Sequence, residues 1–239
     1  MPDIELVSER LGSLYTVPEE DWAAIHQRVD YAENLRDIAG DVARYLPAFP
    51  TLVDACEEWR TTTFAGIVIS AARLSGYSAQ AQDAFSKLEA SADWNGPLSS
   101  DVQQRVVHTI DELAASTAAL AQEFNPLAVA VSSFAQVNRQ ADAEIDAYRR
   151  RMGPEWRTIL PSTQRVDDAT GLVNGAWQAL TADLEALAAG LSPDDVTGPF
   201  VLGLEIAVAE RAWGNLKDEA NAFKQQAPAQ AYLSEVWPG

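Results

Sequence analysis

The sequence predicts an all-α protein, an elongated antiparallel bundle of five long helices. Apolar residues recur at alternating steps of three and four over most of the 239 residues, which is the period of helices packed along a seam. No segment shows the sustained alternation of a half-buried strand. Only short connections separate the periodic segments, as in antiparallel neighbours. We therefore predict a single helical-bundle domain over residues 1–239, with helices at about 18–46, 51–92, 100–152, 162–191 and 199–226.

Capping and proline residues delimit the first two helices. Thr16 and Glu19 form a capping-box pattern ahead of the first apolar run, and Pro47 ends that run. The second run starts near Thr51 and stops at the turn residues 93–97. Within it, residues 61–72 carry no charge and several small side chains. We interpret this stretch as a place of close helix packing, the alternative being a face that opens and repacks against another subunit.

The third run is the longest and contains a proline. Its seam extends from Val102 to Met152, and at 1.5 Å per residue such a helix would be about 75 Å long. Pro126 removes one backbone hydrogen bond and should kink the helix, but the seam keeps its phase across it. We therefore predict one kinked helix. Pro126 is a candidate hinge for a soluble-to-assembled transition, and the alternative is that the kink only sets the shape of the helix.

The last two helices are bounded by glycine and proline. The fourth run continues from Val166 to Leu191 and is broken by Pro193. The fifth run, from Leu202 to Phe223, has strict alternation of four and three. We predict that it ends near residue 226, before the next proline.

Charge and composition restrict the classes of function. The chain has 17 Lys and Arg against 35 Asp and Glu, a net charge of −18, which disfavours nucleic acid and anionic lipid as partners. The single cysteine, Cys56, excludes an intrachain disulfide, and we interpret it as a buried structural thiol. The first residues lack the basic and apolar regions of a signal peptide. We expect a soluble protein, either cytoplasmic or released without a cleavable signal peptide.

No catalytic or metal-binding motif is readable. Neither His26 nor His108 has a glutamate three residues before it, as a di-iron bundle requires, or a cysteine nearby, as a zinc site usually has. The sequence also lacks a Gly-x-Ser-x-Gly nucleophile elbow and a strand-associated phosphate loop. We interpret both histidines as surface or boundary residues. The prediction is a protein that is not an enzyme, with no catalytic residues, no metal and no organic cofactor.

The C-terminal helix pair carries a pattern of spaced tryptophans and leucines. It reads Trp177-x-x-Leu180-x-x-x-Leu184-x-x-Leu187, then a short turn, then Leu202-x-Leu204-x-Ile206-x-x-Ala209-x-x-x-Trp213-x-x-Leu216. Together with Glu57-Glu58-Trp59 and the very long third helix, this arrangement resembles the helical tail of the cytolysin A and haemolysin BL superfamily of α-helical pore-forming toxins, which includes the xenorhabdolysin-type toxins. The resemblance covers roughly residues 18–226. It implies action by protein assembly at membranes.

The chain departs from this family where the family inserts a membrane-entering head, between the third and fourth long helices. Here that place holds only the ten residues from Met152 to Pro161, too few for two membrane spans. The resemblance therefore implies an accessory or binding component without its own head. Its implied partners are a headed toxin subunit, a second copy of the chain or a membrane surface, and not nucleic acid. The alternative is a soluble helical scaffold or interaction protein without membrane activity; a lipid-coating protein is disfavoured by the charge.

The short segment between the third and fourth helices is the candidate contact site. It concentrates four apolar residues where polar turn residues would be expected: Met152, Trp156, Ile159 and Leu160. A tryptophan suits a partner or membrane interface because one edge of the ring is apolar and the other can donate a hydrogen bond. The alternative is that these side chains fold back and cap the end of the core.

Overall fold

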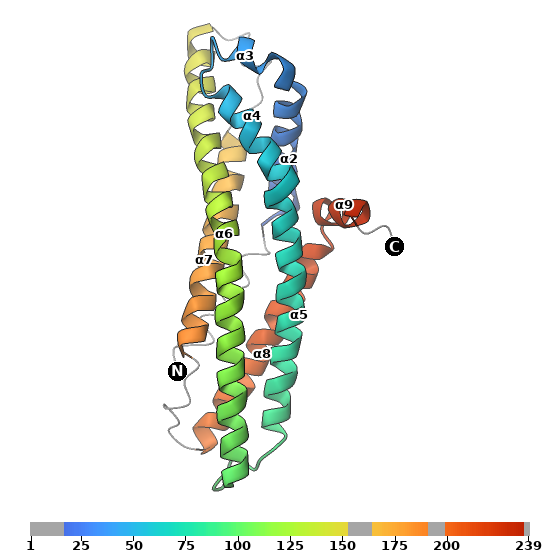
Figure 1. Ribbon diagram of the computed structural model, residues 1–239, viewed down its shortest axis with the longest axis vertical. Coiled ribbons are helices and arrows are strands. Elements are labelled where there is room, and N and C mark those ends of the chain that lie inside the picture. The colour runs from blue at the N-terminus through green and yellow to red at the C-terminus, as the bar shows by residue number, and fades with distance from the viewer. Residues whose placement is uncertain (1–16, 153–163, 191–198, 237–239) are drawn as a thin grey trace. The chain divides into compact units, whose positions relative to one another are not determined.

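The protein is all-helical in the part of the chain that the structure describes. The computed structural model describes residues 17–152, 164–190 and 199–236 (Figure 1). No strand occurs in these ranges, so the all-α prediction is confirmed for them. The elements in order are α2 (Glu19–Asn34), η2 (Arg36–Ile38), α3 (Ala39–Val42), α4 (Phe49–Glu58), η3 (Trp59–Thr63), α5 (Phe64–Glu89), α6 (Ser100–Met152), α7 (Gln164–Gly190), α8 (Pro199–Lys224) and α9 (Ala227–Val236).

The structure interrupts the helix predicted over 18–46. α2 ends at Asn34, and the short 3-10 helix η2 and the four-residue α3 follow it. The seam residues Leu35, Ala39 and Val42 are only half-buried. Because most helical stability in proteins comes from packing of an apolar face, this stretch gains little from a continuous helix.

Two further differences concern a π-helix and a final helix. The second predicted helix consists of α4, the five-residue π-helix η3 and α5. Beyond the predicted fifth helix the chain forms α9, in which Pro228 is the second residue. Proline is tolerated in the first turn of a helix, where its missing N–H has no intrahelical partner anyway. α8 ends at Lys224, close to the predicted end near residue 226, and Pro228 lies in the first turn of a further helix that the sequence pattern does not predict.

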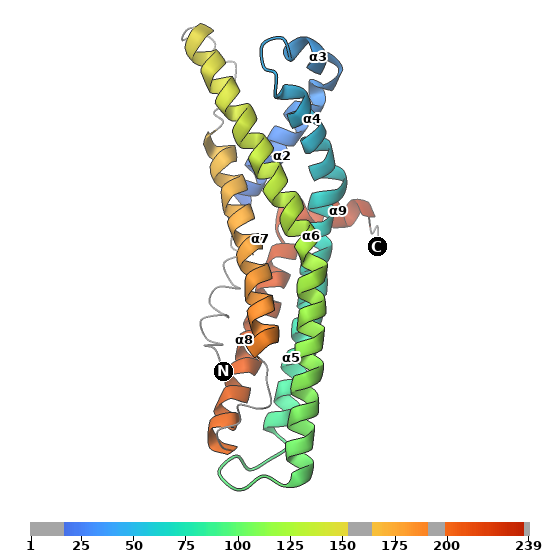
Figure 2. The same ribbon diagram turned by 60° about the vertical axis from the view of Figure 1, so that its left-hand side comes forward.

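The described residues fall into two compact units. Unit 1 contains the described residues of Ile69–Asn125 and Gln178–Gln225, and unit 2 those of Val17–Val68, Pro126–Trp177 and Gln226–Gly239. In unit 1, α5, α6 and α8 run side by side (Figures 1 and 2). Tyr77 of α5 meets Trp213 of α8 edge to face at 5.2 Å between ring centroids, and its hydroxyl donates a hydrogen bond of 2.9 Å to the Leu113 carbonyl of α6. Tyr77 thus connects α5 with α8 through its ring and with α6 through its hydroxyl group.

Unit 2 is built around aromatic side chains. Trp22 of α2 and Trp59 of η3 are almost completely buried. Trp59 stacks on Phe134 of α6, with ring centroids 4.2 Å apart and planes inclined by 29°. The ring centroid of Trp22 lies 5.8 Å from that of Phe64 in α5. The Phe64 centroid also lies 6.3 Å from that of Tyr232 in α9. These contacts attach α9 to the same aromatic core as α2 and α5.

A glycine marks a close approach in unit 1. A Cβ built on Gly203 of α8 would lie 2.7 Å from both Cβ and Cγ of Trp94. The indole N–H of Trp94 donates to the Glu89 carbonyl at 2.8 Å, which restricts how the ring can move away. We expect Gly203→Ala to lower the free energy of unfolding by about 1–3 kcal/mol, measured by chemical denaturation, because the crowded site must rearrange.

The matched control for this substitution is Gly76→Ala in α5. No atom lies within 4 Å of a Cβ built at Gly76, and the residue is exposed. This change should raise the free energy of unfolding by about 0.5–1 kcal/mol, since alanine restricts the unfolded chain more than glycine does. Equal stabilisation by both substitutions would contradict the close packing at Trp94.

Candidate functional site

The predicted contact segment lies almost entirely outside the described residues. Met152 is the last residue of α6. Trp156, Ile159 and Leu160 fall within 153–163, which the structure does not describe. Their role as a partner or membrane contact stays a prediction.

Pro126 lies inside α6, which runs from Ser100 to Met152 as predicted. Its side chain is exposed, and Phe124 nearby is buried. Along α6, Pro126 is the first residue that belongs to unit 2. The hinge role of Pro126 stays a prediction.

The uncharged stretch 61–72 packs closely against α6 at one position. A Cβ built on Gly66 would lie 3.1 Å from Cδ1 of Leu127, tighter than an ordinary van der Waals contact. Ile67 and Ala71 are buried. These contacts agree with the interpretation of this stretch as close helix packing.

The histidines and the cysteine have environments typical of structural residues. His26 is half-buried with its ring edge-on to Phe64 at 4.4 Å, and burial lowers its pKa while Asp30 opposes this. His108 is exposed. Burial raises the pKa of the Cys56 thiol to about 12, with Arg28 opposing. Since the thiolate is the reactive form, Cys56 is a poor nucleophile at neutral pH.

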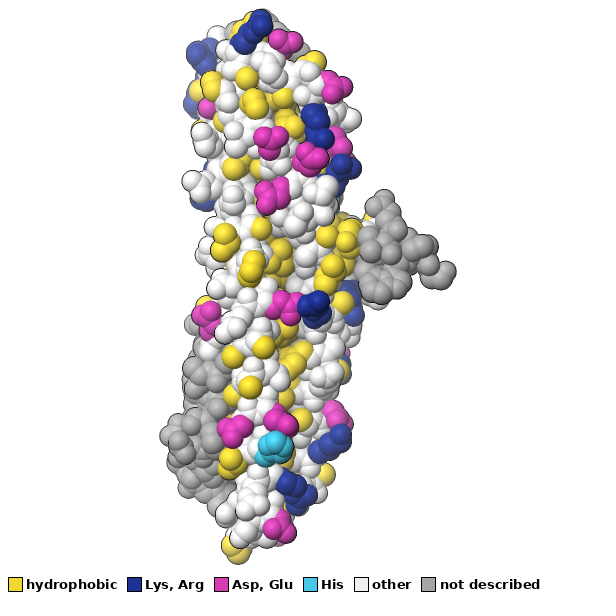
Figure 3. Space-filling view, in the orientation of Figure 1, with side chains coloured by type: hydrophobic (Ala, Val, Ile, Leu, Met, Phe, Trp, Pro, Cys, Tyr) yellow, Lys and Arg dark blue, Asp and Glu magenta, His cyan; other side chains and the backbone are white. Residues whose placement is uncertain are grey.

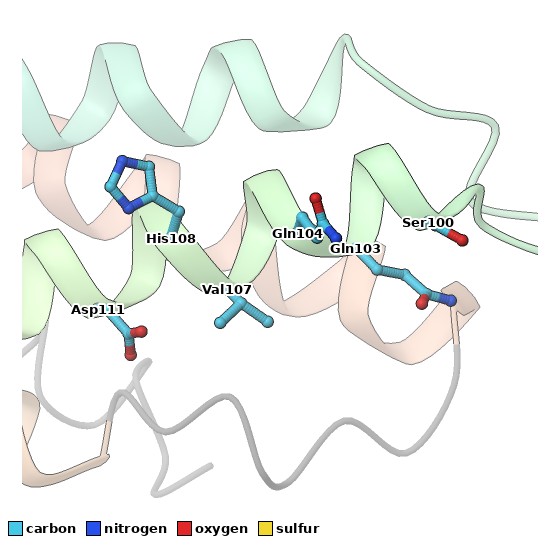
Figure 4. Close-up of a pocket in the computed structure, with 6 residues that line it drawn as sticks. All are labelled: Ser100, Gln103, Gln104, Val107, His108 and Asp111. Atoms are coloured by element: carbon cyan, nitrogen blue, oxygen red, sulfur yellow. The ribbon is translucent and has the colours of Figure 1, made fainter.

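A shallow hollow lies along the start of α6 (Figure 4). Its volume is about 470 Å³. All of its described lining comes from the first turns of this one helix: Ser100, Gln103, Gln104, Val107, His108 and Asp111. Ligand sites usually enclose most of their ligand, and one helix face does not enclose a ligand. No group of His, Cys, Asp and Glu suited to a metal ion occurs among the described residues.

The most unusual feature of unit 2 is a buried charge pair. Nη1 of Arg28 in α2 donates to Oδ1 of Asp142 in α6 at 2.7 Å. The exposed fractions of the two residues are 9% and 3%. Arg28 is surrounded along α2 by the buried Ile25 and Val29. Removing each of two charges from water costs several kcal/mol, which offsets much of the attraction between them. The pair is therefore weak evidence for stabilisation by itself.

Further charges surround this pair, and we call the whole group the Arg28 cluster. It comprises Arg28 of α2, Asp142 of α6 and the charged side chains of α6 and α7 that act on Asp142 or on its neighbour Asp167. Asp146 and Asp167 act on Asp142, and Arg139 and Asp168 act on Asp167. Oδ2 of Asp142 and Oδ1 of Asp167 are buried and have no hydrogen-bond partner. The cluster therefore contains carboxylate oxygens that have lost water without gaining a donor.

The pKa values of the cluster respond to this burial. Burial raises the pKa of Asp142 to about 6, opposed by Arg28 and reinforced by Asp167 and Asp146. Burial also raises the pKa of Asp167, which Arg139 and Arg28 oppose. With a pKa of about 6, Asp142 changes its protonation between neutral and mildly acid pH, so the chemistry that this arrangement supports is proton binding.

The sequence contains a signal for this pair that periodicity analysis missed. Arg28 continues the buried stripe of α2 at steps of three and four, between Ile25 and Ala32. Asp142 does the same in α6, between the buried Asn138 and Ile145. Two opposite charges on apolar stripes of neighbouring helices would have predicted a buried ion pair.

Comparison of the chain with protein-family models, with characterised proteins and with solved structures gave no match. The resemblance to α-helical pore-forming toxins therefore rests on the sequence pattern. Among the described residues, no helix is both long and apolar enough to cross a membrane.

Proposed function

We propose that this chain is a non-enzymatic accessory or binding component of the kind found beside α-helical pore-forming toxins, without a membrane-spanning head of its own. One observation carries the proposal. α6 continues to Met152 and α7 begins at Gln164, which leaves only residues 153–163 where the resembled family has its head. The expected partner is a headed subunit, a second copy of the chain or a membrane surface. The proposal includes the predicted arrangement of the long helices as an elongated antiparallel bundle of five.

The packing of the tryptophans supports action through the folded surface. Trp22, Trp59, Trp177 and Trp213 are each no more than 3% exposed. Their apolar area is thus committed to the protein core, where each side chain contributes a few kcal/mol. Releasing such helices onto lipid would forfeit that burial, so a contact made by the intact fold is favoured.

A second candidate function is a helical scaffold or interaction protein without membrane activity. It is favoured by an exposed apolar group in unit 2; hydrophobic side chains also reach the surface among the charged ones on the face drawn in Figure 3. Tyr45 is 62% exposed and Ile38 is 47% exposed, and the Tyr45 ring lies 6.1 Å from that of Tyr148. Tyrosine is enriched in protein interfaces.

The test is the substitution Trp156→Glu, compared with wild type in two assays. The first assay is association with phosphatidylcholine vesicles, with and without anionic lipid, and self-association by sedimentation. The second is thermal melting. We expect weaker association with an unchanged melting temperature, because a charge opposes an apolar contact but costs stability only if it is buried. Ile38→Glu tests the exposed apolar group of the second candidate function in the same assays. The matched control is Val129→Glu, which places a charge on an exposed apolar residue outside both candidate contacts.

The outcomes separate the alternatives. A lower melting temperature with unchanged association means that Trp156 caps the core, and it removes the contact segment from the proposal. Loss of self-association only in Ile38→Glu favours the scaffold function. Dye release from vesicles by the wild-type chain alone would refute the accessory role.

A further inference from the structure

We propose that the Arg28 cluster is a proton-responsive lock within unit 2. Asp142 takes up a proton as the medium changes from neutral to mildly acid, and unit 2 is then held together more firmly. This inference is independent of the proposed function, because it rests only on the contacts of α2, α6 and α7 inside unit 2.

The geometry around Asp142 favours the added proton. Its Oδ1 accepts from Nη1 of Arg28, whereas its Oδ2 is buried without any donor. A desolvated, unpaired carboxylate oxygen is costly. A proton on Oδ2 removes that charge, and Oδ1 can still accept the hydrogen bond from Arg28 as a neutral carbonyl oxygen.

The charges that act on Asp142 and on the neighbouring Asp167 include more carboxylates than cations. The cations are Arg28 of α2, which acts on both carboxyl groups, and Arg139 of α6, which acts on Asp167. Nη1 of Arg149 in α6 lies 3.4 Å from Oδ1 of Asp146. The thiol of Cys56 in α4 interacts with Arg28, and burial keeps it protonated. Glu144 of α6 accepts from the Ala48 backbone N–H at 2.7 Å. The carboxylates of the cluster itself are those of Asp142, Asp146, Asp167 and Asp168.

The direction of the effect follows from proton linkage. Burial raises the pKa of Asp142 from its ordinary value of 3.8 to about 6, so the folded protein binds this proton more tightly than the unfolded chain does. The stabilisation is complete below the unfolded pKa and is lost as the pH rises through the folded one. Between pH 7 and pH 5, the folding equilibrium constant should therefore increase about tenfold through this one group.

The experiment measures unfolding of the full chain in urea at pH 7 and pH 5, for wild type and for Asp142→Asn. Asparagine keeps the shape of the side chain but cannot ionise. Between pH 7 and pH 5, we expect the factor by which the folding equilibrium constant increases to be about tenfold smaller in Asp142→Asn than in wild type. The control is Asp54→Asn, which removes an exposed acid of α4 and should keep the full rise.

The control is needed because other groups also titrate. Acidification lowers the self-repulsion of a chain with a net charge of −18. Burial raises the pKa of Glu219, and a hydrogen bond with Glu210 raises that of Glu89. Part of the rise will thus persist in Asp142→Asn, and the difference between variants is the diagnostic quantity. An equal rise in all three proteins would overturn the proposal.

A second measurement does not depend on the variant folding. The carboxyl carbon of Asp142 can be followed by NMR in the wild-type chain as the pH is changed. A midpoint near 6 supports the lock. A midpoint below about 4.5, close to the ordinary value for aspartate, overturns it.

Discussion

Replacing Trp59 with alanine is expected to lower the free energy of unfolding by about 3–5 kcal/mol, the usual cost of truncating a buried aromatic side chain. Trp59 is 1% exposed and stacks on Phe134, so its removal leaves a cavity and ends an aromatic contact between η3 and α6. The measurement is urea unfolding followed by circular dichroism, which reports the helices rather than any single tryptophan.

Two comparisons make the Trp59 experiment decisive. Trp59→Phe keeps a ring against Phe134 and should cost less than Trp59→Ala. Tyr45→Ala, at a residue that is 62% exposed, should change stability by no more than about 0.5 kcal/mol. A loss below about 1 kcal/mol for Trp59→Ala would contradict the packing described for unit 2.

Replacing Arg28 with methionine should destabilise the protein by about 3 kcal/mol at neutral pH, because Asp142 is left buried without its counter-charge. The expected value is at the lower end of the usual range, since Asp142 can escape by taking up a proton. For the same reason the loss should shrink at pH 5. The free energy of unfolding, measured at both pH values, checks this.

The double variant Arg28→Met/Asp142→Leu tests whether the loss comes from the unpaired charge. Removing both charges replaces the pair with apolar side chains, which in other proteins is often neutral or stabilising. We expect the double variant to recover most of the stability that Arg28→Met loses. The single variant Asp142→Leu completes the comparison. If the stability losses of Arg28→Met and Asp142→Leu simply add in the double variant, Arg28 and Asp142 do not act as a pair.

Much of the fold could be predicted because the spacing of the apolar residues indicates where the long helices lie. The bounds of α6 coincide with the prediction, and α7 and α8 lie within two residues of theirs. Their capping residues and terminal glycines or prolines are local signals. The interruption after Asn34 has no such signal, because it depends on how much apolar surface residues 35–42 can bury. That is a property of the tertiary structure.

The candidate site was less accessible to sequence reasoning. Hydrophobic periodicity identifies the apolar residues of the core. It does not identify Arg28 and Asp142, which are charged residues at core positions. Cys56 could be predicted as a buried thiol because it lies on a seam. The burial of Arg28 and Asp142 becomes meaningful only when α2 and α6 are placed beside each other.

The π-helix η3 also has a consequence for how the length of this segment can vary. A π-turn closes its hydrogen bonds one residue later than an α-turn. The buried residues Trp59, Thr63, Ile67 and Ala71 accordingly follow one another at three successive steps of four. Deleting one of the exposed residues 60–62 would restore a regular α-helix, and the later side chains of α5 would keep nearly the same orientation relative to α4, because the wider π-turn already accommodates one extra residue. A single-residue deletion is therefore expected to be tolerated within Trp59–Thr63, as length changes are in the connection 90–99. An insertion in the regular part of α5 would instead rotate every later side chain by about 100° and should be rejected.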